Sequence, residues 1–301
     1  MKNITFAGIP AGPVFISLYL LHLSSFEADV MKKMIIAVFF ATLLSPNSFS
    51  QSQLGEVACV YMTTTDLDSS VAVYEKLGFK KTGSNTFPVP WAQVSDGSLL
   101  IMMRKDVTPY IGLTYYATET EKEVARLEKE GIVFYQKPKE GDPIKRYYFK
   151  SPDGLNIMLA SNLGGFQQPT GVTLATMKPE DMMNADKHPN KQCGVFGEFC
   201  HPVKDLAASL AFWKKIGYTI KFESAAPYPH AILTDGLMII GLHQTDHFNY
   251  PAITYFGLNV EKRISELKEK GLKNFTEDGG KNNQVLTTWE GQHFFIFNLG
   301  M

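Results

Sequence analysis

The sequence predicts an α+β protein made of two tandem domains that share one design. Three observations support this: a repeat with nearly constant spacing, apolar residues alternating in strand-like segments, and apolar residues three or four apart in helix-like ones. Within each copy, the order strand, helix and three strands occurs twice. We expect domain 1 at residues 55–163, a polar linker at 164–194 and domain 2 at 195–301.

The repeat is visible in short motifs. Asp66-Leu67 recurs as Asp205-Leu206, and Asp96-Gly97 recurs as Asp235-Gly236, each at an offset of 139 residues. Near the end of the copies, Gly154 matches Gly291 at an offset of 137. Spacings that drift by so little along a whole domain indicate duplicated units that fold alike.

The first half of each copy is a strand, a capped helix and three strands. The opening strand is expected at Val57 to Thr64 and at Phe199 to Val203. Asp66 and Asp205 then stand where a carboxylate caps a helix. Apolar residues in steps of four, three and three give each helix one buried face; they are Leu67, Val71, Tyr74 and Leu77, and Leu206, Leu210, Trp213 and Ile216. Gly78 and Gly217 are expected to end these helices.

The second half of each copy repeats this order. In domain 1 we expect a strand at Ile111–Ala117, a helix at Glu121–Lys129 and a last strand at Asn156–Ala160. The counterparts in domain 2 are Ile253–Leu258, Lys262–Lys270 and Phe294–Asn298. Eight strands per domain are therefore expected.

Composition excludes several classes of function. The 301 residues carry 29 Lys and Arg against 30 Asp and Glu, a net charge of −1, so neither nucleic acid nor a membrane surface is an expected partner. Three cysteines exclude a disulfide scaffold, although Cys193 and Cys200 are close enough in sequence to pair in an oxidising compartment. A small molecule is the expected partner, and the oligomeric state is left open.

The N-terminal region predicts export. Residues 31–50 combine Met31-Lys32-Lys33, an apolar run from Met34 to Leu44 and a small-residue cleavage site before Gln51, which are the parts of a secretory signal peptide. Residues 1–30 precede this complete signal, so we interpret them as an upstream extension and Met31 as the true start. A periplasmic or secreted protein is expected.

Three stretches of sequence carry a resemblance to a known superfamily. They are the stretch from Asp66 to Phe79, the stretch from Ser151 to Ile157 downstream of it, and the stretch from Asp205 to Tyr218, and they resemble the vicinal oxygen chelate superfamily. This superfamily includes glyoxalase I, bleomycin-resistance proteins and extradiol dioxygenases. The resemblance covers residues 55–301 and implies paired βαβββ modules whose strands curl around a cavity. One fold hosts many functions, so the chemistry must come from the site.

The metal positions that this resemblance implies are poorly filled. The first-strand ligand position is Cys59 in domain 1 and Glu198 in domain 2, and the last-strand position is Met158 or Phe295. Methionine and phenylalanine do not bind a hard divalent cation. Domain 1 is therefore expected to hold no metal.

Domain 2 retains a possible set. Glu198, His243 and His293 would form a facial triad suited to Fe(II) or Mn(II) if all three converge. The alternative is a cavity carboxylate, with the histidines in separate hydrogen bonds. Glu198 is also the candidate catalytic base. The candidate ligand-binding residues are Trp91, Tyr115, His230, Tyr255 and Phe295.

Three functions follow from these patterns. The first is binding of a small amphipathic or aromatic molecule without a cofactor, as in the bleomycin-resistance branch. The second is a metal-assisted lyase, isomerase or dioxygenase, similar to glyoxalases and dioxygenases, with its site in domain 2. The third is a structural or partner-binding module whose cavities are filled by side chains. Whether the protein is an enzyme stays open at this point.

Overall fold

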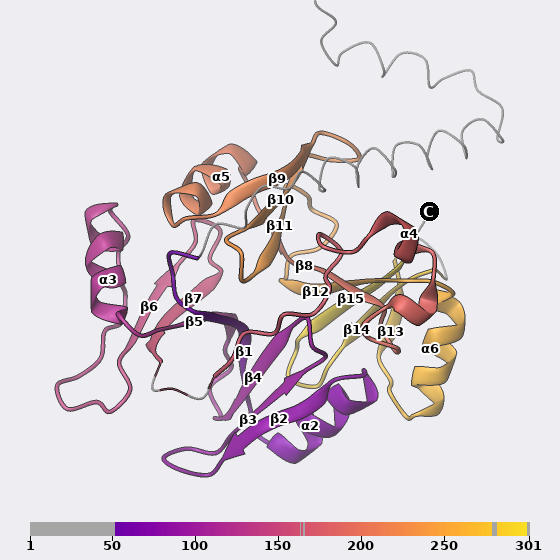
Figure 1. The fold of residues 1–301 in the computed structure, drawn as a ribbon, viewed down its shortest axis with the longest axis horizontal. Coiled ribbons are helices and arrows are strands. Elements are labelled where there is room, and N and C mark those ends of the chain that lie inside the picture. The colour runs from indigo at the N-terminus through magenta and orange to yellow at the C-terminus, as the bar shows by residue number, and fades with distance from the viewer. Residues whose placement is uncertain (1–51, 163, 165, 279–281, 300–301) are drawn as a thin grey trace, which may run out of the picture.

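The computed structural model describes residues 52–162, 164, 166–278 and 282–299 (Figure 1). The predicted upstream extension and signal peptide lie outside these residues. Within the described part of the chain, no helix is long and apolar enough to cross a membrane.

Domain 1 is a single sheet in the order β2-β3-β4-β1-β5-β7-β6. Its strands are β1 (Val57–Thr64), β2 (Lys80–Asn85), β3 (Trp91–Ser95), β4 (Leu100–Lys105), β5 (Ile111–Ala117), β6 (Arg146–Lys150) and β7 (Asn156–Ser161). Strand β1 pairs in parallel with β4 and antiparallel with β5, which joins the two modules edge to edge. Helices α2 (Leu67–Lys76) and α3 (Thr120–Lys129) belong to the two modules.

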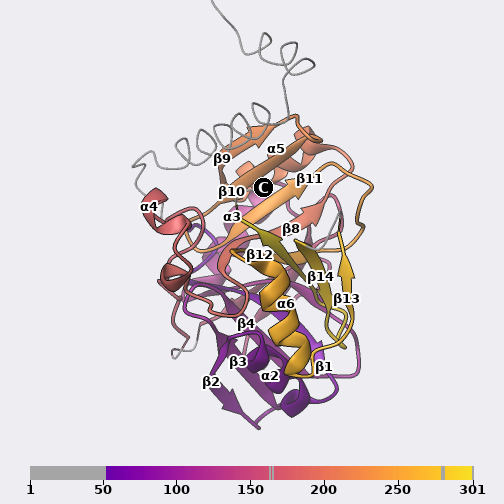
Figure 2. The same cartoon turned by 90° about the vertical axis from the view of Figure 1, so that its right-hand side faces the viewer.

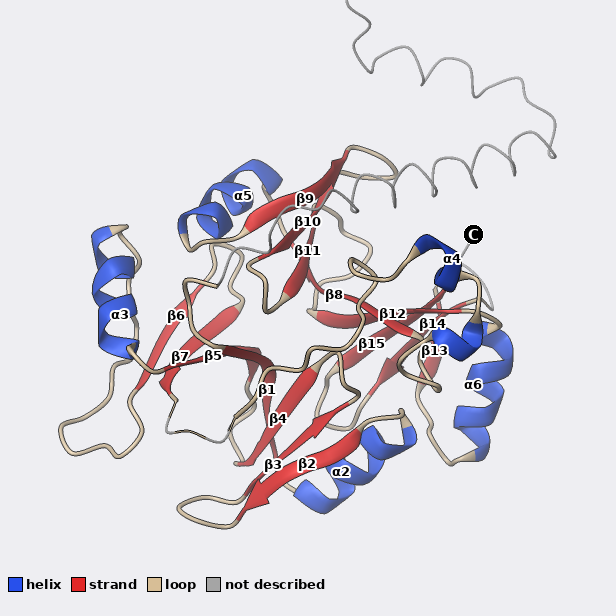
Figure 3. Ribbon diagram, in the orientation of Figure 1, coloured by secondary structure: helices blue, strands red, loops and turns tan. Residues whose placement is uncertain are grey.

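Domain 2 repeats this plan in the order β13-β14-β15-β12-β8-β11-β10-β9. Its strands are β8 (Val195–Pro202), β9 (Thr219–Ser224), β10 (His230–Thr234), β11 (Ile239–His243), β12 (Ala252–Gly257), β13 (Phe275–Glu277), β14 (Asn283–Thr287) and β15 (His293–Asn298). Helices α5 (Leu206–Lys215) and α6 (Val260–Glu269) complete it. Strands β8 and β12 form the junction between its modules. The predicted tandem βαβββ design is confirmed, and Figure 3 shows the strand-rich body with helices around it.

The prediction of eight strands holds for domain 2 but is wrong for domain 1, whose sheet has seven. The counterpart of β13 is reduced to one bridge between Gln136 and Tyr148. Pro138 follows two residues later and lacks the backbone N–H that a longer ladder needs.

Both predicted helix caps are confirmed. An Asp66 carboxylate oxygen accepts a hydrogen bond from the Ser69 backbone N–H at 3.1 Å, and Asp205 accepts one from the Ala208 N–H at 3.0 Å. Gly78 follows α2 with φ 91°, a conformation that residues with a Cβ rarely adopt.

The first module of each domain packs against the second module of the other domain. Tyr74 of α2 contacts Phe294 of domain 2 with ring centroids 5.9 Å apart, and Phe212 of α5 contacts Phe149 of domain 1 at 6.5 Å. The turn residue Asp153 of domain 1 accepts a hydrogen bond from the Lys204 N–H, just before α5, at 2.9 Å. Most of the buried apolar residues of both domains form one continuous core. Figure 2 shows β9 and α5 of domain 2 at the top and β2, β3 and α2 of domain 1 at the bottom, and α3 and α6 lie at opposite sides in Figure 1.

The linker runs across both domains. It contains α4 (Pro179–Met182) and a short 3-10 helix (Ala185–Lys187). Gln168 accepts a hydrogen bond from the Ala58 N–H at 2.8 Å and donates one to the Leu237 carbonyl at 3.0 Å. Further along, the Leu174 N–H donates to the Phe196 carbonyl at 2.8 Å. The linker therefore fixes side chains over the concave faces of both sheets.

Candidate binding sites

The deep part of the concave face of domain 1 is apolar and closed. Cys59, Met102 and Met158 lie there with Tyr116, and the linker residue Phe166 packs on them. Phe166 stacks on Tyr116 with ring centroids 4.5 Å apart. Burial raises the pKa of the Cys59 thiol far above its usual range, so Cys59 is a neutral packing residue rather than a thiolate ligand. The residues at the implied metal positions of domain 1 do not fit a metal.

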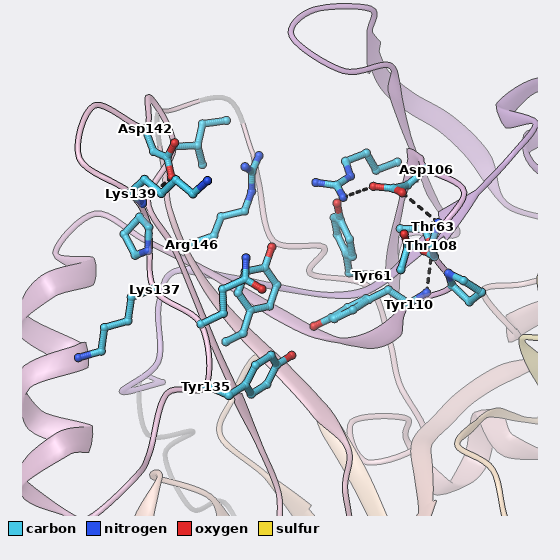
Figure 4. Close-up of a pocket in the computed structure, with 16 residues that line it drawn as sticks. Tyr61, Thr63, Asp106, Thr108, Tyr110, Tyr135, Lys137, Lys139, Asp142 and Arg146 are labelled. Carbon is cyan, nitrogen blue, oxygen red and sulfur yellow. Dashed lines mark hydrogen bonds and ion pairs between the residues drawn. The ribbon is translucent and has the colours of Figure 1, made fainter.

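The mouth of the same face is an open polar cavity of about 650 Å³ (Figure 4). That volume lies in the range of small-molecule pockets. Four tyrosines line it: Tyr61 of β1, Tyr110, Tyr135 and Tyr148 of β6. Its charged lining residues are Arg104, Asp106, Lys137, Lys139, Asp142 and Arg146.

The tyrosine rings form a connected aromatic wall. Tyr61 and Tyr110 meet edge to face with centroids 5.7 Å apart, and Tyr110 meets Tyr148 in the same way at 6.1 Å. Burial raises the pKa of Tyr61 to about 12, although Arg104 and Arg146 act in the opposite direction. Burial likewise raises the pKa of Tyr148. These phenols therefore stay protonated and able to donate hydrogen bonds.

The two arginines differ in their pairing. Arg104 forms an ion pair with Asp106 at 2.5 Å. The guanidinium of Arg146 makes no hydrogen bond or ion pair within the described parts of the chain, and Figure 4 shows it extending into the cleft. The Tyr110 hydroxyl is also buried without a hydrogen-bond partner there. The cavity thus presents a free cation and a free donor beside aromatic rings.

Two loops hold the sides of this cavity. On one side the Thr63 hydroxyl donates to the Thr108 carbonyl at 2.7 Å and accepts from the Tyr110 N–H at 2.8 Å. On the other side Asp142 accepts from the Lys139 N–H at 2.7 Å. Figure 4 shows Thr108 and Lys139 facing each other across the opening.

Domain 2 has a smaller and different site. Nε2 of His243 lies 2.9 Å from Oε1 of Glu198. This pair lines a pocket of about 130 Å³ with apolar walls that include Leu174, Ala175 and Phe256. Glu198 is only 6% exposed, and its Oε2 has no hydrogen-bond partner among the described residues.

A glycine makes this pair possible. A Cβ atom at Gly241 would lie 1.9 Å from Glu198 Oε2 and 2.7 Å from His243 Nε2, so no other residue fits there without moving both groups. Gly241 stands in β11 opposite Cys200 of β8, beside the Glu198 position. The first-strand carboxylate therefore fills the space that a ligand side chain on β11 would need.

The predicted metal triad is not assembled. His293 stacks on Tyr250 with centroids 3.6 Å apart, and its Nδ1 lies 3.0 Å from the Thr287 hydroxyl. Burial lowers the pKa of His293. Across residues 52–299, apart from the few that the structure leaves undescribed, no three His, Cys, Asp or Glu side chains lie together as a metal-ligand set. Only the Glu198 and His243 members of the predicted set meet, so the residues present do not fit a divalent metal.

The predicted ligand-binding residues divide into two groups. Trp91 lies beside Phe166 at 5.8 Å on the concave side of domain 1, and His230 lines the small pocket of domain 2 with its ring parallel to that of His243. Phe295 is buried against Phe248 at 5.2 Å and fills the concave face.

Tyr115 and Tyr255 require a correction, because both are fully buried in the core between the domains. The Tyr255 hydroxyl donates to Asp96 of the other domain at 2.5 Å, and the Tyr115 hydroxyl contacts that of Tyr218. They hold the domains together and do not reach a cavity.

Sequence reasoning missed the cavity at the mouth of domain 1. Its residues come from β1, β4, β6 and two loops, and none of them is in the predicted set. Strand alternation was the available signal, because Tyr61 lies two residues from Cys59 and so on the same face. Strand register gives a further signal. Arg104 pairs with Trp91 in domain 1 as His243 pairs with His230 in domain 2, so Arg104 is the counterpart of His243.

The comparisons with known proteins concern structure only, since no protein-family model and no curated protein matches the sequence. Homoprotocatechuate 2,3-dioxygenase from Arthrobacter globiformis aligns over 85% of this chain and 83% of its own, with 13% identity and a TM-score of 0.52. The 2,3-dioxygenase LapB from Pseudomonas sp. KL28 aligns over 84% and 94%, with 12% identity and a TM-score of 0.52. Such identities show the fold and not the reaction. With its two sheets of paired βαβββ modules, the chain has the tandem vicinal oxygen chelate fold that the extradiol dioxygenases share.

Proposed function

We propose that domain 1 binds a small aromatic carboxylate, without a metal, in the cavity at the mouth of its concave face. The observation that carries this proposal is the free guanidinium of Arg146 beside four tyrosines in a cavity of about 650 Å³. A guanidinium binds a carboxylate through two parallel hydrogen bonds, and tyrosine edges and faces pack on an aromatic ring. Both parts of such a ligand therefore have a matching surface.

Charge favours an anion over a neutral ligand. Arg104 is already paired with Asp106, whereas Arg146 lies half-buried with no acidic partner in the described chain. A partly desolvated cation gains more from an incoming carboxylate than an exposed one. The protonated Tyr61 and Tyr110 hydroxyls add donors for the same carboxylate.

A metal-dependent dioxygenase is the alternative that the structural neighbours suggest. The donor set argues against it, because Cys59 and Met158 in domain 1 and Phe295 in domain 2 stand at the implied ligand positions. We therefore derive no reaction step through a metal. Oxygen consumption with catechols and added Fe(II) would decide in favour of this alternative.

The test of the binding proposal is calorimetric titration with benzoate and phenylacetate. We expect saturable binding to the chelator-treated protein, with benzyl alcohol binding more weakly. Arg146→Ala should weaken the affinity about 10- to 100-fold, the loss typical of a hydrogen bond to a charged group. Arg126→Ala is the matched control, because Arg126 pairs with Glu123 on α3, away from the cavity. Equal binding to both variants, or binding only with added metal, would refute the proposal.

Export is a separate proposal, since residues 31–50 carry the parts of a signal peptide. Expression with the full N-terminal region, followed by N-terminal sequencing of the exported chain, should find Gln51 or a near neighbour. A mature chain that retains Met1 would contradict it.

A further inference from the structure

The small pocket of domain 2 contains buried hydrogen-bond acceptors that have no donor among the described residues. Glu198 is a carboxylate that only accepts, so His243 Nε2 must donate across their 2.9 Å contact. In the neutral imidazole, Nδ1 is then an acceptor, and it too is buried without a partner among the described residues. Two acceptors, Glu198 Oε2 and His243 Nδ1, therefore stay unsatisfied, which is costly in a buried site.

We propose that this pocket is a second ligand site, independent of domain 1, which binds a small organic ammonium ion on Glu198. An alkylammonium group brings three N–H donors and a positive charge that compensates the negative charge of a buried carboxylate. The pocket lining contains Glu198 and two histidines but no lysine or arginine to neutralise it. The apolar walls formed by Ile232, Ile239 and Phe256 suit the alkyl part of such an ion.

The site is built for this pair. Gly241 leaves the space that the Glu198 carboxylate occupies, and Gly197 leaves room for the Phe256 ring, which a Cβ there would approach to 2.6 Å. The linker residues Leu174 and Ala175 close one side of the pocket. Burial, and then the charge of Glu198, raise the pKa of the neighbouring Tyr228 to about 12.

Size limits the ligand. A pocket of about 130 Å³ admits only a few heavy atoms, far fewer than the 650 Å³ cavity of domain 1. We therefore name ethylammonium as the probe, with ethanol as the neutral comparison and acetate as the anionic one. The two domains would then select ligands of opposite charge.

The experiment is titration of the full folded chain with each probe, followed by calorimetry or by the histidine NMR signals. Ethylammonium should saturate one site per chain, ethanol should bind at least about tenfold more weakly, and acetate should not bind. Glu198→Gln keeps the shape but removes the charge, and should weaken ethylammonium binding about 10- to 100-fold. Ala175→Phe leaves the Glu198–His243 pair intact but fills the pocket, and should abolish binding.

Control variants separate this site from the one in domain 1. Arg146→Ala should leave ethylammonium binding unchanged, and Glu198→Gln should leave benzoate binding unchanged. If Glu198→Gln does not fold, Ala175→Phe decides the question alone. The inference is overturned if ethylammonium does not bind, if it binds Ala175→Phe as well as the native chain, or if acetate binds in its place.

Discussion

Single residues at equivalent positions of the two domains have diverged in ways that predict measurable effects. His201 in β8 lies two residues from the core residue Phe199, hence on the same face of the strand. It is 6% exposed, and neither ring nitrogen has a hydrogen-bond partner among the described residues. Its counterpart at the offset of 139 residues is Met62, a buried apolar side chain. The methionine of domain 1 is therefore a suitable substitution for testing how this buried histidine affects the stability of the protein.

We predict that His201→Met makes stability less dependent on pH. Burial lowers the pKa of His201, with Asp153 acting in the opposite direction, so the unfolded state takes up a proton that the folded state resists. The contribution of neutral His201 to the free energy of unfolding is therefore fully present above the unfolded pKa of 6.5. It is lost as pH drops through 6.5 toward the lowered folded pKa. Urea unfolding at pH 7.5 and 5.5 should show a smaller difference for His201→Met than for the native chain. The exposed His247→Gln should keep the native difference, and an unchanged difference in His201→Met would contradict the argument.

A second prediction at this scale concerns Tyr61. Because its pKa is raised to about 12, its hydroxyl stays a donor over the whole range in which the protein is handled. Benzoate affinity should accordingly be constant between about pH 7 and 10. A tyrosine with an ordinary pKa of about 10 would already be partly ionised at the upper end of this range. Tyr61→Phe should weaken binding by a few fold without changing this flat profile. A loss of benzoate affinity near pH 9 would contradict this prediction, because it would mean that Tyr61 ionises there and that its negative charge repels the carboxylate.

At the scale of elements, the caps give the simplest prediction. Asp205 binds the Ala208 N–H at the start of α5, where a carboxylate also meets the helix dipole. Asp205→Ala should destabilise the protein by about 0.5–2 kcal/mol in equilibrium denaturation. Asp205→Asn, which keeps an acceptor oxygen, should recover most of that loss. Ligand affinity in both domains should stay the same, since α5 lines neither cavity; a drop in affinity at unchanged stability would show another role.

The sequence predicted elements well where the signal is local. Asp66, Gly78 and the helical apolar stripe lie within one short segment, and the structure confirms each of them. Prediction from the sequence failed where the position of a side chain depends on contacts between residues far apart in the chain. Alternation groups Tyr115 with its neighbours on one face of β5, but only the packed structure shows that this face meets the other domain. Arg146 and Tyr148 were missed because β6 reaches the cavity through pairing with β7, which no local pattern records.

At the scale of the whole molecule, the two domains share their stabilising contacts. Tyr255 of domain 2 donates to Asp96 of domain 1 at 2.5 Å, and the Asn190 side chain of the linker reaches the same carboxylate oxygen at 3.2 Å. The buried cores are continuous across this boundary. Neither domain therefore keeps its full core when the other unfolds, and the equilibrium between folded and unfolded chain should involve both at once.

We predict a single cooperative unfolding transition, with calorimetric and van't Hoff enthalpies in agreement. Tyr255→Phe removes the hydrogen bond to Asp96 and leaves that carboxylate oxygen only its contact with Asn190, so it should lower the free energy of unfolding by about 1–3 kcal/mol. The whole transition should move to lower temperature without splitting, because the lost bond belongs to both domains. Tyr116→Phe is the comparison within one domain, since its hydroxyl contacts the weak acceptor Met102 Sδ, and it should cost less. Two separate transitions, or a shift confined to one of them in Tyr255→Phe, would show that the tandem domains fold independently.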